Sequence, residues 1–297
     1  MRLNDDSGSS AAGPAVDDKG ESAKEVGRRF YADIHRKKDD SGYRITYTTD
    51  GEAFKHVDSP TKIPAEAGDK VYVDVIPVMH IDGFIELLRR GAEVHYLRRL
   101  TLIKQMRKRL GIESKSAKTD VRILMNIEEK WFKRVDEDFL AMRQLISPFR
   151  RLERTKQRLE NQYKDVPDVA KQSFKRLIDH IEEEKLVVAR PIIEEAERRY
   201  PLFKLIAEEL GLTGDSHLLG RQALAELLTY VDFSRSFTDV RIYLGLFRQR
   251  INNQKYNHIA RKALNRLTMS ITNKEPRARD EEEIAFKIWL TYRRGAQ

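Results

Sequence analysis

Every segment with a strand-like pattern lies in the first 130 of the 297 residues. These segments alternate large and polar side chains or are rich in β-branched residues, and they cover 28–38, 43–49, 70–78 and 92–97. Between the last two, Phe84, Leu87 and Leu88 share one helical face, and Gly91 ends that helix. A hairpin followed by strand, helix and strand predicts an α/β domain with a mixed sheet over residues 26–130.

From residue 131 to residue 200 there is no strand pattern, and two long amphipathic helices are predicted instead. The apolar residues of the first helix recur at spacings of three and four: Phe139, Met142 and Ile146. Ser147 and Pro148 resemble an N-cap and a first-turn proline, which predicts that the helix restarts there.

After a break at 165–169, a second helix is predicted. Its apolar stripe contains Phe174, Leu177, Ile181 and Val188. Two such helices joined by a short turn predict a long, coiled-coil-like helical hairpin over 131–200. Apolar clusters at short intervals then predict a helical C-terminal domain over 201–297. The expected fold class is α+β with an α/β domain followed by two helical parts.

Charge and composition limit the possible partners. The chain has 56 Lys and Arg against 47 Asp and Glu, a net charge of +9, which favours polyanions. It contains no cysteine, which excludes disulfides, thiolate metal sites and thiol nucleophiles and fits a cytoplasmic protein. No run approaches the roughly 18 apolar residues of a membrane helix, so no membrane contact is expected. Residues 1–25 carry six acids against three bases without an apolar core, which predicts a disordered leader.

Several enzyme classes lack their motifs in this chain. The patterns GxGxxG, GxxxxGK[ST], HExxH and GxSxG are all missing. The seven histidines are scattered without the spacing of metal ligands. Nucleotide-binding, zinc-protease and serine-hydrolase chemistry is therefore not indicated.

Three aspartates stand in positions that suggest a metal site. Asp33 lies in FYADIH, Asp74 in the middle of VYVDVIPV, and Asp120 at the apparent start of the helix TDVRILMNI. A carboxylate inside an apolar strand is expensive to desolvate unless a cation such as Mg²⁺ compensates it. Two strand acids and one helix acid would suit a phosphodiester-cleaving metal site. Alternatively, Asp33 or Asp74 faces solvent, and Asp120 only complements the helix dipole.

A basic run lies next to these acids. Between Arg89 and Arg122 there are eleven Lys and Arg against three acids, a local charge of +8. Such a run can be a solvated face, but its concentration beside the aspartates predicts phosphate contacts. The candidate nucleic-acid-binding residues are Arg98, Arg99, Lys104, Arg107, Lys108, Arg109, Lys115 and Lys118.

Residues 89–124, RRGAEVHYLRRLTLIKQMRKRLGIESKSAKTDVRIL, resemble the signature segment of DEDD-type transposases of the insertion sequence 110 family and of Piv-type DNA invertases. Asp33 matches the first-strand aspartate of that family, Asp74 the place of its usual glutamate, and Asp120 the acid of its K-T-D motif. FSRSFTDVRIYLGL and IARKALNRLTMSI are similar to segments of its C-terminal transposase domain.

The resemblance implies a RuvC-like (RNase H-type) α/β domain, a coiled-coil hairpin and a helical transposase-like domain. It also implies a DNA recombinase that binds DNA and a structured, guide-like RNA and uses Mg²⁺ on Asp33, Asp74 and Asp120. The helical hairpin would join two or four copies into a homo-oligomer. Such a protein would work in the cytoplasm, associated with the nucleoid.

The sequence departs from the family pattern at four places. Ile123 occupies the place of the fourth acid, Asp74 replaces a glutamate, and LLGR at 218–221 replaces PGIG. After Gly245-Leu246 no serine follows until Ser270, so no nucleophile is assigned. A catalytically inactive, repurposed transposase that only binds DNA or RNA is therefore the alternative. A structural ribonucleoprotein subunit or a helical scaffold would also be compatible with this composition.

Overall fold

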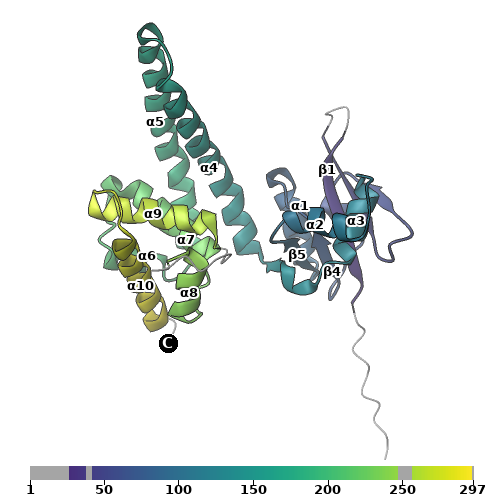
Figure 1. Ribbon diagram of the computed structural model, residues 1–297. Coiled ribbons are helices and arrows are strands. Elements are labelled where there is room, and N and C mark those ends of the chain that lie inside the picture. Colours follow the sequence, from purple (N-terminus) through teal and green to yellow (C-terminus); the bar gives the residue numbers. More distant parts are fainter. Residues whose placement is uncertain (1–26, 38–41, 247–255, 296–297) are drawn as a thin grey trace, which may run out of the picture.

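The computed structural model describes residues 27–37, 42–246 and 256–295, and the predicted leader at 1–25 lies outside them. An α/β part and a helical part lie on either side of a helical hairpin that projects away from both (Figure 1). The expected combination of an α/β part with helical parts is confirmed.

One mixed sheet forms the centre of the α/β part. Its strands are β1 (Arg29–Arg36), β2 (Tyr43–Thr48), β3 (Lys55–Val57), β4 (Lys70–Val73), β5 (Glu93–Leu97) and β6 (Phe132–Val135). Their order is β3-β2-β1-β4-β5-β6. The first three strands pair antiparallel, β4 and β5 run parallel to β1, and β6 is antiparallel to β5. The predicted mixed sheet is confirmed.

Two details of the sheet differ from the prediction. Strand β4 ends at Val73, so Asp74 follows the strand instead of lying inside it. Strand β6 lies in a segment where no strand was predicted. Its four residues have a buried apolar residue at each end, Phe132 and Val135, and this is too short to show an alternating pattern.

The two faces of the sheet are covered by different helices. The helices of this part are α1 (Ile81–Arg89), α2 (Thr101–Arg109) and α3 (Ala117–Met125). Phe30, Ala32 and Val73 belong to the large core that also contains α1 residues. Tyr72 belongs to a second core with residues of α3, and half-buried Tyr31 packs against it. Side chains alternate along a strand, so a residue two positions after Tyr31 or Tyr72 lies on the same face. Asp33 and Asp74 therefore belong to this second face of the sheet.

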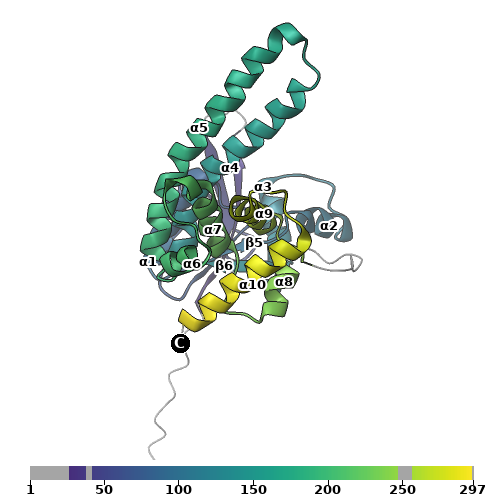
Figure 2. The same ribbon diagram turned by 90° about the vertical axis from the view of Figure 1, so that its left-hand side faces the viewer.

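The hairpin consists of α4 (Glu137–Tyr163) and α5 (Asp168–Arg199), as predicted (Figures 1 and 2). The expected restart at Pro148 is wrong, because Pro148 lies inside one continuous α4. Ser147 does not cap a helix, since its hydroxyl donates to the Arg143 carbonyl at 2.6 Å. Buried Ile146 and Phe149 pack on both sides of the proline, and this packing outweighs the lost backbone hydrogen bond.

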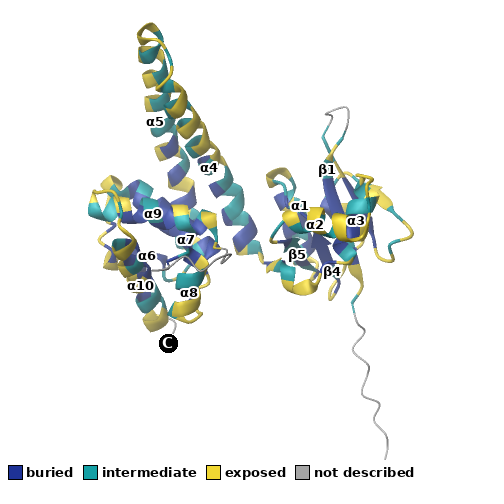
Figure 3. Cartoon of the chain, in the orientation of Figure 1, coloured by how far each residue is buried: buried dark blue, intermediate teal, exposed yellow. Residues whose placement is uncertain are grey.

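Burial in the hairpin falls off away from its base. Figure 3 shows buried residues where α4 and α5 meet the rest of the chain and exposed residues toward the tip. Leu177, assigned to the apolar stripe of the second helix, is 52% exposed. The other three residues of the stripe, Phe174, Ile181 and Val188, are half-buried, so Leu177 is the exposed member of the stripe within the described part of the chain.

The C-terminal part is a cluster of short helices. They are α6 (Phe203–Glu209), α7 (Leu218–Tyr230), α8 (Phe237–Leu244), α9 (His258–Thr272) and α10 (Ala278–Gly295). Short 3-10 turns elsewhere cover Pro60–Lys62, Val78–His80, Glu129–Trp131 and Asp215–His217. Helix α7 is central: most of its residues are buried, and it packs against α5 and α9. The predicted helical character of 201–297 is confirmed for its described residues.

Gly220 in α7 sets how closely α9 approaches. A Cβ at this position would lie 2.5 Å from the Ser270 hydroxyl oxygen and 2.9 Å from a Leu212 methyl group. We expect Gly220→Ala to lower the free energy of unfolding by about 1–3 kcal/mol, because two packed elements must separate. Urea unfolding measures this. Gly214→Ala is the control, because Gly214 has open space around it and a φ of 74°. Its loss of stability reports backbone strain without crowding.

Candidate carboxylate site and nucleic-acid interface

Asp33 and Asp74 lie side by side on the face of the sheet that α3 covers. Strands β1 and β4 run parallel and pair Ala32 with Val73, so the next residue of each chain segment is one of these aspartates. Asp33 is 7% exposed and Asp74 is 9% exposed. The Ile34 N–H donates to Asp74 Oδ1 at 3.3 Å. The alternative in which either acid faces solvent is wrong.

The two carboxyl groups are desolvated and repel each other. Burial raises the pKa of Asp74 to about 7, and the neighbouring charge of Asp33 contributes to the rise. Burial likewise raises the pKa of Asp33 to about 6, although His35, whose Nδ1 lies 2.9 Å from Asp33 Oδ2, opposes that rise. A cation placed between these groups would favour their charged forms.

Asp120 reaches the same region from α3. Ser116 caps this helix by accepting the Thr119 N–H at 3.2 Å, which places Asp120 in the first turn as predicted. Its negative charge contributes to the raised pKa of Asp33. Asp33 therefore lies within electrostatic reach of both Asp74 and Asp120. Asp120 complements the helix dipole as well, so the two interpretations of this residue are compatible.

Arg107 holds Asp120 in the present arrangement. Its guanidinium, from α2, forms an ion pair with Asp120 Oδ1, and its buried Nε has no hydrogen-bond partner. Within 27–37, 42–246 and 256–295, no group of three His, Cys, Asp or Glu is placed to hold a metal ion. Asp33 and Asp74 are suited to bind a hard cation, because both are buried and offer carboxylate oxygens. Asp120 could join them only if its ion pair with Arg107 is broken.

The position of the family's fourth acid belongs to the core. Ile123 is fully buried in the second core, together with Leu124 and Tyr72. An acid at this position would lie among apolar side chains without a partner. The site therefore has at most three carboxylates.

The predicted phosphate-binding residues form two groups. Arg107 is half-buried on Asp120, and the Arg99 guanidinium lies 5.3 Å from the centre of the Trp131 ring. The remaining residues are exposed: Arg98, Lys104, Lys108, Arg109, Lys115 and Lys118. Since α2 and the loop before α3 carry most of them, a basic surface lies beside the acids.

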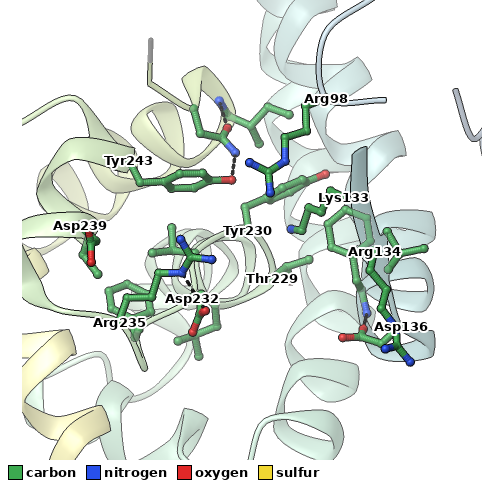
Figure 4. Close-up of a pocket in the computed structure, with 18 of the residues that line it drawn as sticks. Arg98, Lys133, Arg134, Asp136, Thr229, Tyr230, Asp232, Arg235, Asp239 and Tyr243 are labelled. Carbon is green, nitrogen blue, oxygen red and sulfur yellow. Dashed lines mark hydrogen bonds and ion pairs between the residues drawn. The ribbon is translucent and has the colours of Figure 1, made fainter. Parts of the chain in front are cut away.

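A second candidate site was not predicted from the sequence. A cavity of about 1420 Å³ separates the β5–β6 edge of the sheet from α7 and α8 (Figure 4). Arg98, Lys133, Tyr230 and Tyr243 are among the residues that line it. Arg98 follows β5 and the other three lie in β6, α7 and α8, so the four are spread over about half of the chain and no local pattern connects them. Arg98 was among the candidates as part of the basic run, and so was Arg99, which also lines the cavity.

The serines of the C-terminal part have structural contacts. The Ser234 hydroxyl donates to Asp232 Oδ1 at 2.5 Å, and Ser236 caps α8 by accepting the Asp239 N–H at 3.2 Å. Ser270 lies against Gly220. None of these contacts resembles an activated nucleophile with an adjacent base.

No protein-family model matches the chain. No curated protein sequence matches it either. Among the helices that the structure describes, none is both long and apolar enough to span a membrane.

Proposed function

We propose that this protein is a transposase or site-specific DNA recombinase relative with a Mg²⁺-dependent carboxylate site in a RuvC-like α/β domain. The observation that carries the proposal is the buried pair of Asp33 in β1 and Asp74 after β4, with the charge of Asp120 in α3 near enough to contribute to the raised pKa of Asp33. The acids are distant in the sequence, and burial of two of them side by side is unfavourable without a function or a counter-ion.

The sheet supports the RuvC-like part of the proposal. Strands β1, β2 and β3 form an antiparallel unit, and β4 and β5 follow on the other side of β1, parallel to it. An RNase H-type domain requires this arrangement. Asp33 and Asp74 lie on its two central neighbouring strands or directly after them. This places them where parallel strands bring side chains together.

Bound Mg²⁺ would polarise a phosphodiester and help to generate a hydroxide nucleophile. Asp33 and Asp74 would hold it, with Asp120 joining them once it leaves Arg107. The released Arg107 would then be free to contact a phosphate of the nucleic acid. His35 would stay hydrogen-bonded to Asp33 and fix the orientation of that carboxylate.

The basic surface and the hairpin support the proposed partners. The exposed cations of α2 and the following loop suit the phosphates of DNA and of a structured RNA. Four large apolar side chains of α5 are exposed: Val169 at 90%, Leu177 at 52%, Leu186 at 41% and Val187 at 62%. Pairing of this helix with a second hairpin would cover them and give a dimer or tetramer. A nucleoid-associated cytoplasmic location follows from these partners.

One observation favours a catalytically inactive, nucleic-acid-binding protein as the second candidate. The Arg107–Asp120 ion pair neutralises one acid without a metal, and Ile123 removes the fourth. Under this alternative the site is a structural remnant, and the basic surface alone provides the function.

Metal-dependent strand cleavage separates the two candidates. The substrate is supercoiled DNA together with the RNA that co-purifies with the protein. We expect cleavage that EDTA abolishes, and we expect Asp33→Asn and Asp74→Asn to lower its rate at least about 100-fold, since a metal supplies several kcal/mol. Asp50→Asn, an exposed loop acid, is the control.

Arg107→Gln tests the ion pair itself. We expect this variant to need less Mg²⁺ than the wild type for half-maximal thermal stabilisation, because Asp120 is no longer occupied. If neither protein responds to Mg²⁺ and neither cleaves, the inactive alternative stands.

A further inference from the structure

We propose that the cavity between the β5–β6 edge and helices α7 and α8 binds a single strand of nucleic acid, with a phosphate on Arg98 and Lys133 and a base on Tyr243. The proposal rests on the nucleic-acid-binding part of the proposed function and is independent of its metal site. We call this cavity, defined by those three residues with Tyr230 and Arg235, the interdomain groove.

The interdomain groove contains cations without anionic partners. Arg98 is exposed at the end of β5, and the Lys133 ammonium lies 4.5 Å from the centre of the Phe139 ring. In the described part of the chain, neither forms an ion pair with an acid. Burial, followed by the charge of Arg98, lowers the pKa of Lys133. Two nearby cations that disfavour each other create a site that an anion stabilises.

The acids that line the groove are occupied elsewhere. Asp136 caps α4 by accepting the Phe139 N–H at 2.7 Å, and Asp138 pairs with Arg199. Asp232 accepts from Arg235 at 3.1 Å, and Asp239 accepts from the Ser236 hydroxyl at 2.7 Å. None of these four acids forms an ion pair with Arg98 or Lys133 in the described part of the chain, although the charges of Asp136 and Asp232 oppose the lowering of the Lys133 pKa.

Aromatic rings stand opposite the cations. Figure 4 shows Arg98 and Lys133 pointing into the same space as Tyr243 of α8. Tyr243 is 37% exposed as a residue, and its hydroxyl accepts a hydrogen bond from the Asn257 amide at 2.5 Å. A fixed, exposed ring across from cations is the combination that single-strand-binding grooves use, because base faces stack on the ring while phosphates meet the charges. A duplex hides these base faces.

The size and position of the groove suit a polymer. Its volume of about 1420 Å³ exceeds the roughly 300–1,000 Å³ of small-molecule pockets. Arg98 is followed three residues later by α2, whose other end carries Arg107 on Asp120. A strand leaving the groove along α2 would therefore reach the carboxylates.

Fluorescence anisotropy with labelled 12-nucleotide oligo-dT and oligo-U, in EDTA, tests the proposal on the full chain. We expect Arg98→Gln/Lys133→Gln to weaken single-strand binding roughly tenfold and to reduce its dependence on salt concentration. The control Arg151→Gln/Lys175→Gln removes the same charge from exposed positions of α4 and α5 and should change binding less than twofold. A preference for oligo-dT or oligo-U identifies DNA or RNA as the ligand.

Variants of Tyr243 separate stacking from folding. We expect Tyr243→Leu to weaken binding roughly tenfold and Tyr243→Phe to retain it, because the phenylalanine ring still stacks. The groove proposal would be overturned if the groove and control double variants weakened binding equally, or if the wild type bound only duplex. Either result would leave the proposed function intact. Absence of binding to any nucleic acid would overturn both.

Discussion

Asp74→Asn is expected to be more stable than the wild type at pH 8 by up to about 4 kcal/mol. The pKa of Asp74 rises from 3.8 to about 7, and one unit of pKa corresponds to about 1.4 kcal/mol. Because the folded state binds the proton more tightly than the unfolded state, the stability of the wild type falls as the pH rises from about 4 to 7. Asparagine lacks this titration, and its amide oxygen can still accept the Ile34 N–H.

Urea unfolding between pH 4.5 and pH 8 measures the effect. The advantage of Asp74→Asn should be small at pH 4.5 and should grow toward pH 8. Asp50 provides the control of opposite sign, because hydrogen bonds from the Glu52 and Ala53 backbone lower its pKa. A wild type whose stability does not fall between pH 4.5 and pH 8 would contradict the strain assigned to Asp74.

The same variant links stability to the proposed activity. Mg²⁺ should stabilise the wild type at pH 8, because it binds the folded state, and should have little effect on Asp74→Asn. The variant would then be more stable and less active. Such a trade-off between stability and activity is expected where an unfavourable buried charge is retained for function.

The acids could be predicted from the sequence because their signal is local. Asp33 interrupts an apolar strand, Asp74 follows one, and Asp120 stands three residues after the start of a helix. Each position limits the direction of its side chain through the period of its element. The strand register that places Asp33 beside Asp74 is a tertiary property, and no pattern in the sequence contains it.

Other features depend on contacts between distant segments. Arg107 was assigned to phosphate, because nothing in the sequence shows that it faces Asp120 across α2 and α3. Pro148 was taken as a helix start, because the buried neighbours that keep α4 continuous come from packing. The interdomain groove also depends on tertiary contacts, because Lys133 and Tyr243 line one cavity only when the α/β part and the helical part are packed together.

A buried charge cluster joins the hairpin to the C-terminal part. Glu226 of α7 is 1% exposed and pairs with Arg266 of α9, and Arg150 Nε of α4 lies 3.5 Å from its carboxylate. The Arg266 guanidinium also lies 5.2 Å from the centre of the Phe149 ring. Three helices therefore depend on one carboxylate that has almost no access to water.

Removing one partner of this cluster should be more harmful than removing both. We expect Arg266→Leu to lower the free energy of unfolding by about 3–5 kcal/mol, because Glu226 keeps a buried charge with weakened compensation. Glu226→Leu/Arg266→Leu should recover most of the loss, since apolar side chains of similar size tolerate the same environment. Urea unfolding of both single variants and the double variant completes the cycle. Additive losses would mean that Glu226 and Arg266 act independently and that packing of Phe149, not the ion pair, holds the three helices together.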